Sequence, residues 1–111
     1  MVNYNEQQLS QVFSALSDPT RREMLIRLGQ NEMSIADLSM PFNITKSAIT
    51  KHVKVLENAG LLKRTIDGRV HHCRFDPEPL KQASDWMKFY DKFWNSKFNA
   101  LDVFLAKEEQ S

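Results

Sequence analysis

The spacing of apolar residues along the chain predicts short amphipathic helices in its first half. A first helix is expected over residues 6–17, where apolar side chains recur at intervals of three and four and so share one face. A second helix is expected to begin with Asp18 as N-cap and Pro19 at the first helical position, where the missing proline N–H does no harm. Gly29 is expected to end this second helix.

Residues 34–59 carry the pattern of a helix-turn-helix. Ser34 is a candidate N-cap for a short third helix, and Asn43 suits the tight turn that follows because asparagine tolerates the left-handed conformation. Thr45 is expected to cap a longer fourth helix, which stops at Gly60. A short helix, a tight turn and a longer helix therefore follow one another.

The hydrophobic period changes over residues 61–75, where the pattern becomes that of two short strands. These strands are expected over residues 61–66 and 69–75, with Asp67-Gly68 as a two-residue hairpin turn. A basic hairpin directly after a helix-turn-helix is typical of a wing. Asp76-Pro77 then starts a last helix, expected over residues 77–106.

These elements predict a mainly α fold with a β-hairpin wing, in the order four helices, two strands and a final helix. With 111 residues, 41% of them hydrophobic and 26% charged, the chain fits one globular winged helix-turn-helix domain over residues 1–111. The lone Cys73 can form no internal disulfide, and residues 1–6 lack the basic and apolar segments of a signal peptide. No apolar run is long enough to span a membrane, so a cytoplasmic protein without membrane contact is expected.

The net charge of +1 is unevenly distributed along the chain. Residues 45–75 hold seven basic and two acidic side chains, net +5, whereas the rest holds eight basic and twelve acidic ones, net −4. One basic block between acidic flanks favours docking of a single face on a polyanion.

The predicted fourth helix has an apolar face and an opposite face of hydroxyls and lysines without a carboxylate. Such side chains bond to base edges and phosphates, and an arginine beside the wing turn reaches a minor groove or its backbone. An ordinary solvated face would instead carry Glu–Lys pairs, and only Lys54 and Glu57 have that option here. The residues expected to contact double-stranded DNA are Thr45, Lys46, Ser47, Thr50, Lys51, Lys54 and Arg69.

Three stretches resemble the ArsR/SmtB family of bacterial winged-helix repressors, and the resemblance extends over residues 13–105. They read ALSDPTRR at 15–22, SAITKHVKVL at 47–56 with AGL at 59–61, and GRV at 68–70. The resemblance implies a homodimer built from the first and last helices, an operator with two-fold symmetry, and repression of transcription. The residues expected in the dimer interface are Leu9, Val12, Phe13, Trp86, Tyr90, Phe93, Trp94, Phe98 and Leu101.

The chain departs from the metal-sensing members of that family. Their third helix carries Cys-x-Cys-Asp-Leu, but residues 34–38 here read SIADL, and no histidine follows His72. His71 and Cys73 would share one strand face and His72 the other, so the three cannot easily converge on one metal ion. No metal and no cofactor is therefore expected.

The sequence contains no phosphate-binding loop, no nucleophile–histidine–carboxylate set and no paired catalytic carboxylates, so no catalytic residue is assigned and no enzyme is expected. The alternatives are a winged-helix module that binds protein instead of DNA, or a regulator controlled by an organic ligand or by oxidation of Cys73. The sequence does not identify an effector.

Overall fold

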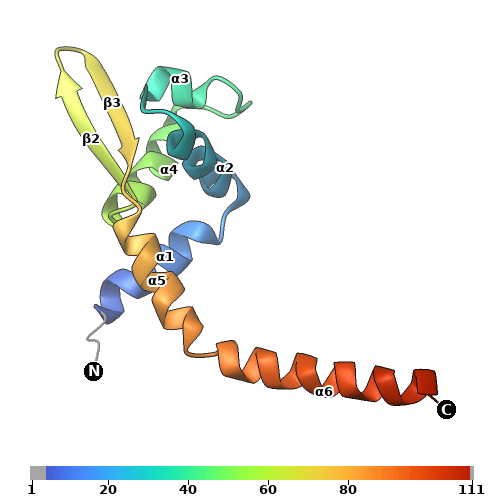
Figure 1. The fold of residues 1–111 in the computed structure, drawn as a ribbon. Coiled ribbons are helices and arrows are strands. Elements are labelled where there is room, and N and C mark those ends of the chain that lie inside the picture. Colours follow the sequence, from blue (N-terminus) through green and yellow to red (C-terminus); the bar gives the residue numbers. More distant parts are fainter. Residues whose placement is uncertain (1–4, 111) are drawn as a thin grey trace.

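The structure, a computed structural model, describes residues 5–110; the sequence expectation for residues 1–4 lies outside them. It confirms a mainly α fold with a β wing (Figure 1). The elements in chain order are α1 (Glu6–Leu16), α2 (Pro19–Gln30), β1 (Met33–Ser34), α3 (Ile35–Ser39), α4 (Lys46–Asn58), β2 (Leu62–Asp67), β3 (Val70–Phe75), α5 (Glu78–Lys88) and α6 (Asp91–Gln110).

The starts of α2, α3 and α4 agree with the predicted N-caps. Side-chain oxygens of Asp18, Ser34 and Thr45 each accept a hydrogen bond from the backbone N–H three residues later, at 3.0–3.1 Å. These bonds satisfy donors that the first helical turn leaves free. α4 ends as predicted at Gly60, whose φ of +78° is a left-handed conformation that glycine adopts without strain.

The wing differs from the prediction in two details. It is a three-stranded antiparallel sheet in the order β1-β3-β2, because Met33 and Ser34 pair with Cys73 and His72. A two-residue strand is too short to give a periodic signal. The hairpin turn is Gly68–Arg69 rather than Asp67-Gly68, since Asp67 pairs with Val70 and Gly68 has a φ of +63°.

The hydrophobic core lies where α1, α2, α4 and the base of the wing meet. Leu9 and Val12 of α1 belong to this core, with 8% and 1% of their surfaces exposed. They face their own domain and leave almost no surface for a partner, and their assignment to a dimer interface stays a prediction. The buried residues are Leu9, Val12, Ala15, Met24, Leu25, Leu28, Leu38, Ile49, Val53, Leu56, Ala59, Leu61, Leu62, Cys73 and Ala83.

The last helix is not continuous, so the prediction of one helix over residues 77–106 is wrong. α5 stops at Lys88, and the N–H groups of Phe89 and Tyr90 bond to carbonyls only three residues back, at 3.2 and 2.9 Å. This tight turn interrupts the helical ladder before α6 begins. Neither glycine nor proline marks the break; rather, Tyr90 packs edge-on against the rings of Trp86 and Phe89.

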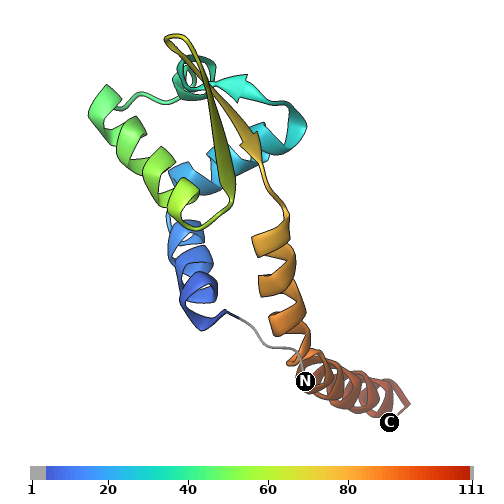
Figure 2. The same cartoon turned by 90° about the vertical axis from the view of Figure 1, so that its left-hand side faces the viewer.

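The break divides the C-terminal region into two parts with different surroundings. α5 lies beside α1, whereas α6 leads away from the other helices in both side views (Figures 1 and 2). The radius of gyration is consequently 19.3 Å, against about 13 Å for a compact domain of this length. Within residues 5–110, no helix is long and apolar enough to cross a membrane.

Candidate nucleic-acid interface

The two faces of α4 separate as the sequence predicts. Ile49, Val53 and Leu56 are buried against the core. The opposite side is exposed, and we call it the α4 outer face: Lys46, Ser47, Thr50, Lys51 and Lys54. At 100° per residue these five side chains span an arc of about 140°, wide enough to enter a groove as one surface.

Two hydroxyls at the start of α4 already make bonds within the helix. Thr45 Oγ1 accepts the N–H of Ala48 at 3.1 Å, so this threonine holds the helix terminus in place. Thr50 Oγ1 donates to the carbonyl of Lys46 at 3.0 Å. In this rotamer the Thr50 oxygen offers only its lone pairs outward, which makes the side chain an acceptor beside a methyl group.

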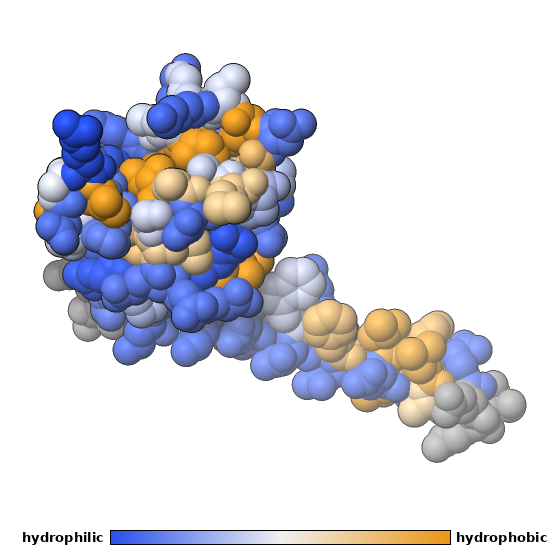
Figure 3. Space-filling view, turned by 90° about the horizontal axis from the view of Figure 1, so that it is seen from above, coloured by the Kyte–Doolittle hydropathy of each residue, from blue (hydrophilic) through white to orange (hydrophobic). Residues whose placement is uncertain are grey.

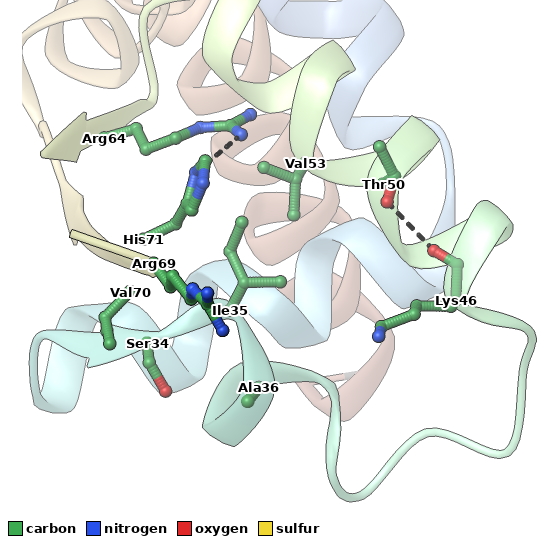
Figure 4. A pocket seen from close by; sticks show the side chains of 10 residues that line it. All are labelled: Ser34, Ile35, Ala36, Lys46, Thr50, Val53, Arg64, Arg69, Val70 and His71. Atoms are coloured by element: carbon green, nitrogen blue, oxygen red, sulfur yellow. Dashed lines mark hydrogen bonds between the residues drawn. The ribbon is translucent and has the colours of Figure 1, made fainter. Parts of the chain in front are cut away.

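A cleft of about 540 Å³ lies between α3, α4 and the wing (Figure 4). Lys46 and Thr50 line it from α4, and Arg69 lines it from the tip of the hairpin. Ser47, Lys51 and Lys54 lie farther around α4 and are not among its lining residues. Three of the seven predicted DNA contacts therefore share this cleft. The others that line it are Ser34, Ile35, Ala36, Val53, Arg64, Val70 and His71.

Arg64 fixes the wing to α4, a role that the sequence analysis did not find. Its guanidinium donates to both carboxylate oxygens of Glu57, at 3.2 and 3.0 Å, and lies 3.3 Å from His71 Nδ1 (Figure 4). Glu57 had been considered only as a partner of Lys54. Arg64 occupies this carboxylate, and Lys46, Lys51, Lys54 and Arg69 have no ion-pair partner among the described residues.

Arg21 connects α1 to α4. Its guanidinium donates to the carbonyls of Ala15 at 2.8 Å and Ser14 at 3.0 Å, which satisfies acceptors at the open end of α1. The same group lies 3.2 Å from His52 Nδ1, which must accept because arginine only donates. His52 is thus a structural histidine, and its contact with Arg21 joins α2 to α4.

Asp18 completes the same cluster. The backbone N–H of Arg21 stabilises its carboxylate and lowers its pKa below the ordinary value, and the nearby Arg21 guanidinium acts in the same direction. Partial burial opposes this shift. The carboxylate therefore remains charged at neutral pH and caps α2 strongly.

The Cys73 thiol is a poor candidate for a redox switch. It is 1% exposed, and burial raises its pKa above the ordinary value, although Arg64 partly opposes this effect. A buried protonated thiol reacts slowly, because the thiolate is the nucleophile. His71 is half-buried on the same strand face and His72 is exposed on the other, and no His, Cys, Asp and Glu cluster suited to a metal occurs within residues 5–110.

Comparison with known proteins identifies the family. Residues 18–64 match the family described as "Bacterial regulatory protein, arsR family". The transcriptional repressor SdpR of Bacillus subtilis is 32% identical over 79 residues, which is 71% of this chain and 88% of SdpR. The HTH-type transcriptional regulator YuzN of the same species is 39% identical over 77 residues, which is 63% of this chain and 84% of YuzN.

A solved structure extends the similarity over most of the fold. The crystal structure of an ArsR family transcriptional regulator superposes with a TM-score of 0.79 at 33% identity, covering 86% of this chain and 98% of that one. The chain belongs to the ArsR family of bacterial regulatory proteins. It is therefore a winged-helix transcriptional regulator that binds DNA, as predicted, and not an enzyme.

Proposed function

We propose that the protein binds an inverted-repeat operator as a homodimer and represses transcription from the promoter that contains it. The observation that carries this proposal is the α4 outer face, which holds three lysines with no ion-pair partner in the described part of the chain. Unneutralised lysines on an exposed helix attract phosphate, and their counterions are released when DNA binds.

The contacts divide by position along α4. Thr45, Lys46, Ser47 and Thr50 lie at its N-terminal end, which approaches base edges in helix-turn-helix proteins. Lys51 and Lys54 would contact the phosphate backbone along the major groove. Arg69 would contact the neighbouring minor groove or its phosphates from the wing tip.

Repression and a cytoplasmic location are supported by the relatives. SdpR is named a transcriptional repressor, and an operator covered by a dimer excludes polymerase. Residues 34–38 lack the thiolates of metal-sensing members, which supports regulation without a metal. Control by an organic ligand is the alternative, and the cleft beside α4 does not favour it because this cleft lies on the surface that we propose faces DNA.

The test is selection from a random pool of DNA duplexes with the purified full-length chain. We expect an enriched inverted repeat with half-sites about one helical turn apart. The Lys46→Ala and Ser47→Ala variants should change the preferred bases, whereas Lys81→Ala on α5 should leave them unchanged. Absence of any enriched motif, together with salt-insensitive or undetectable binding, would contradict the proposal and favour a protein-interaction module.

A further inference from the structure

The tip of the wing stands clear of the hydrophobic core. Leu62 and Cys73 are buried at the base of the wing, whereas the side chains of residues 65–70, which form its tip, are all exposed. The tip and α3 lie at the same end of the molecule (Figure 1), and Figure 3 looks onto this end, where hydrophilic side chains surround an apolar centre. The position of Arg69 beside the turn therefore depends on what holds the wing below its tip.

Arg64 holds the wing on its β2 side. Its side chain is only 19% exposed, and its guanidinium donates to both carboxylate oxygens of Glu57 on α4, at 3.2 and 3.0 Å. The same group reaches β3, where His71 Nδ1 lies 3.3 Å away and must accept because arginine only donates (Figure 4). On the β3 side, pairing with β1 extends toward the tip only as far as His72. One planar group thus joins both strands of the hairpin to α4.

The length of the wing makes this attachment important for Arg69. Asp67 lies five residues beyond Leu62 on β2, a distance of about 17 Å at about 3.3 Å per residue. A tilt of about 10° at the base would therefore move the tip by about 3 Å, which is more than a hydrogen bond tolerates. A bidentate arginine–carboxylate pair opposes such a tilt because its two parallel bonds fix direction as well as distance.

Arg64 and Arg69 line the same cleft but differ in charge compensation. Glu57 neutralises Arg64, whereas Arg69 has no ion-pair partner in the part of the chain that the structure describes. The narrow minor groove of A·T-rich DNA has an enhanced negative potential that attracts an inserted arginine. An arginine held at a fixed place responds to the width of that groove, whereas an arginine on a mobile wing finds a phosphate beside any sequence.

We propose that Arg64 is a positioning residue for DNA recognition. By joining β2 to Glu57 it fixes Arg69 relative to the α4 outer face, and this geometry gives the protein a preference for A·T-rich sequence flanking each half-site. The inference rests on the operator binding proposed above and adds a determinant of the flanking sequence. Arg64 acts through Arg69 and not by contacting a base.

The test uses two operators that share the selected inverted repeat and differ only in A·T-rich or G·C-rich flanks. Titration with the purified full-length chain should show about tenfold tighter binding to the A·T-rich operator. Arg69→Ala should remove this preference. Arg64→Lys should remove it as well, because lysine keeps the charge but cannot form the paired bonds. In the double variant, Arg64→Lys should change the affinity by less than about twofold beyond the effect of Arg69→Ala.

The matched control is Arg74→Lys, which makes the same substitution on the opposite face of the hairpin, where exposed Arg74 is paired in register with Lys63. It should keep the wild-type preference. Glu57→Ala provides a second route, because it removes the partner on α4 and leaves Arg64 in place. It should lose the preference as Arg64→Lys does. If Arg64 instead contacted phosphate directly, Glu57→Ala would strengthen binding to both operators and keep their ratio, which would overturn the proposal.

The remaining outcomes separate this inference from the proposed function. A wild-type chain without a flank preference, or Arg64→Lys and Glu57→Ala chains that retain it, overturns the positioning role. Independent, additive effects of Arg64→Lys and Arg69→Ala overturn it too. In each of these cases, binding of the inverted repeat by the wild-type chain leaves the proposed function intact. Failure of the wild-type chain to bind any inverted repeat would refute that function and the inference with it.

Discussion

Single side chains on α4 are proposed to contact either bases or phosphates, and the salt dependence of DNA affinity distinguishes the two kinds of contact. Lys51 and Lys54 lack ion-pair partners in the described structure, so each is free to neutralise one phosphate. We expect Lys51→Ala and Lys54→Ala each to weaken binding to all sequences and to reduce the slope of log affinity against log salt by about one. Titrations of one operator at several salt concentrations measure this slope. Lys81→Ala is the control, and an unchanged slope in both α4 variants would contradict the assigned face.

Asp18 links a single carboxyl group to the stability of the domain. Its pKa is lowered in the folded state chiefly by the Arg21 N–H, so its contribution is fully present above the ordinary aspartate pKa of about 3.9. That contribution is lost as the pH falls through the lower folded-state value. We expect Asp18→Ala to reduce the free energy of unfolding by about 1 kcal/mol at pH 7, measured by urea denaturation.

The control for this prediction is Asp18→Asn, which retains a capping oxygen but has no charge to titrate. It should retain much of the stability at neutral pH and lose the part of the acid dependence that Asp18 supplies. Equal acid profiles for the wild-type chain and the Asp18→Asn variant would show that Asp18 does not contribute through its ionisation.

At the scale of elements, two glycines have opposite roles. Gly60 ends α4 with a φ of +78°, and an added Cβ would lie 2.9 Å from Gln8 Nε2 and 3.3 Å from Pro79 Cγ. Gly29 was expected to end α2 but lies within it, since α2 continues to Gln30, and an added Cβ there would meet nothing within 4 Å. We expect Gly60→Ala to destabilise the fold by more than about 1 kcal/mol and Gly29→Ala to stabilise it by about 0.5–1 kcal/mol. Thermal denaturation measures both, and a change of the same sign in the two variants would refute this reading of the glycines.

The predictability of each element follows from how local its signal is. The caps at Asp18, Ser34 and Thr45 were predicted because a capping bond joins residues only three apart. The wing was found from Gly68 and the alternating strands, although the turn was placed one residue too early, since Asp67-Gly68 and Gly68–Arg69 both suit a short hairpin. β1 was missed because its pairing with Cys73 and His72 is a tertiary contact.

The break after Lys88 escaped prediction for a different reason. The apolar period continues across it without proline or glycine, so the sequence favours one long helix. The turn instead depends on how the rings of Trp86, Phe89 and Tyr90 pack in three dimensions. For the α4 outer face, the sequence correctly predicted which side chains are exposed. The Arg64–Glu57 and Arg21–His52 contacts were not predicted, since each joins two elements.

For the whole molecule, the proposed homodimer would link stability to protein concentration. A chain with 8309 Å² of accessible surface would bury more apolar area by forming the homodimer proposed above. We expect the unfolding midpoint to rise with protein concentration between low micromolar and hundreds of micromolar, as measured by scanning calorimetry at matched heating rates. A Leu101→Asp variant, which places a charge among the apolar residues expected in the dimer interface, should show a smaller rise. A midpoint independent of concentration in the wild type would indicate a stable monomer.

The tight turn between α5 and α6 directs α6 away from the α4 outer face, so substitutions at the two places can accumulate independently. The α4 outer face and α6 lie at opposite ends of the molecule (Figure 1) and share no side chain. After a gene duplication, substitutions in the proposed dimer interface would stop two paralogues from forming mixed pairs while each keeps its target sequence. Changes on α4 can equally redirect one copy to new promoters while its choice of partner is preserved. In the proposed homodimer, the residues that contact DNA would therefore differ from those that hold the partner subunit. Several such regulators could then coexist in one cell without forming mixed dimers.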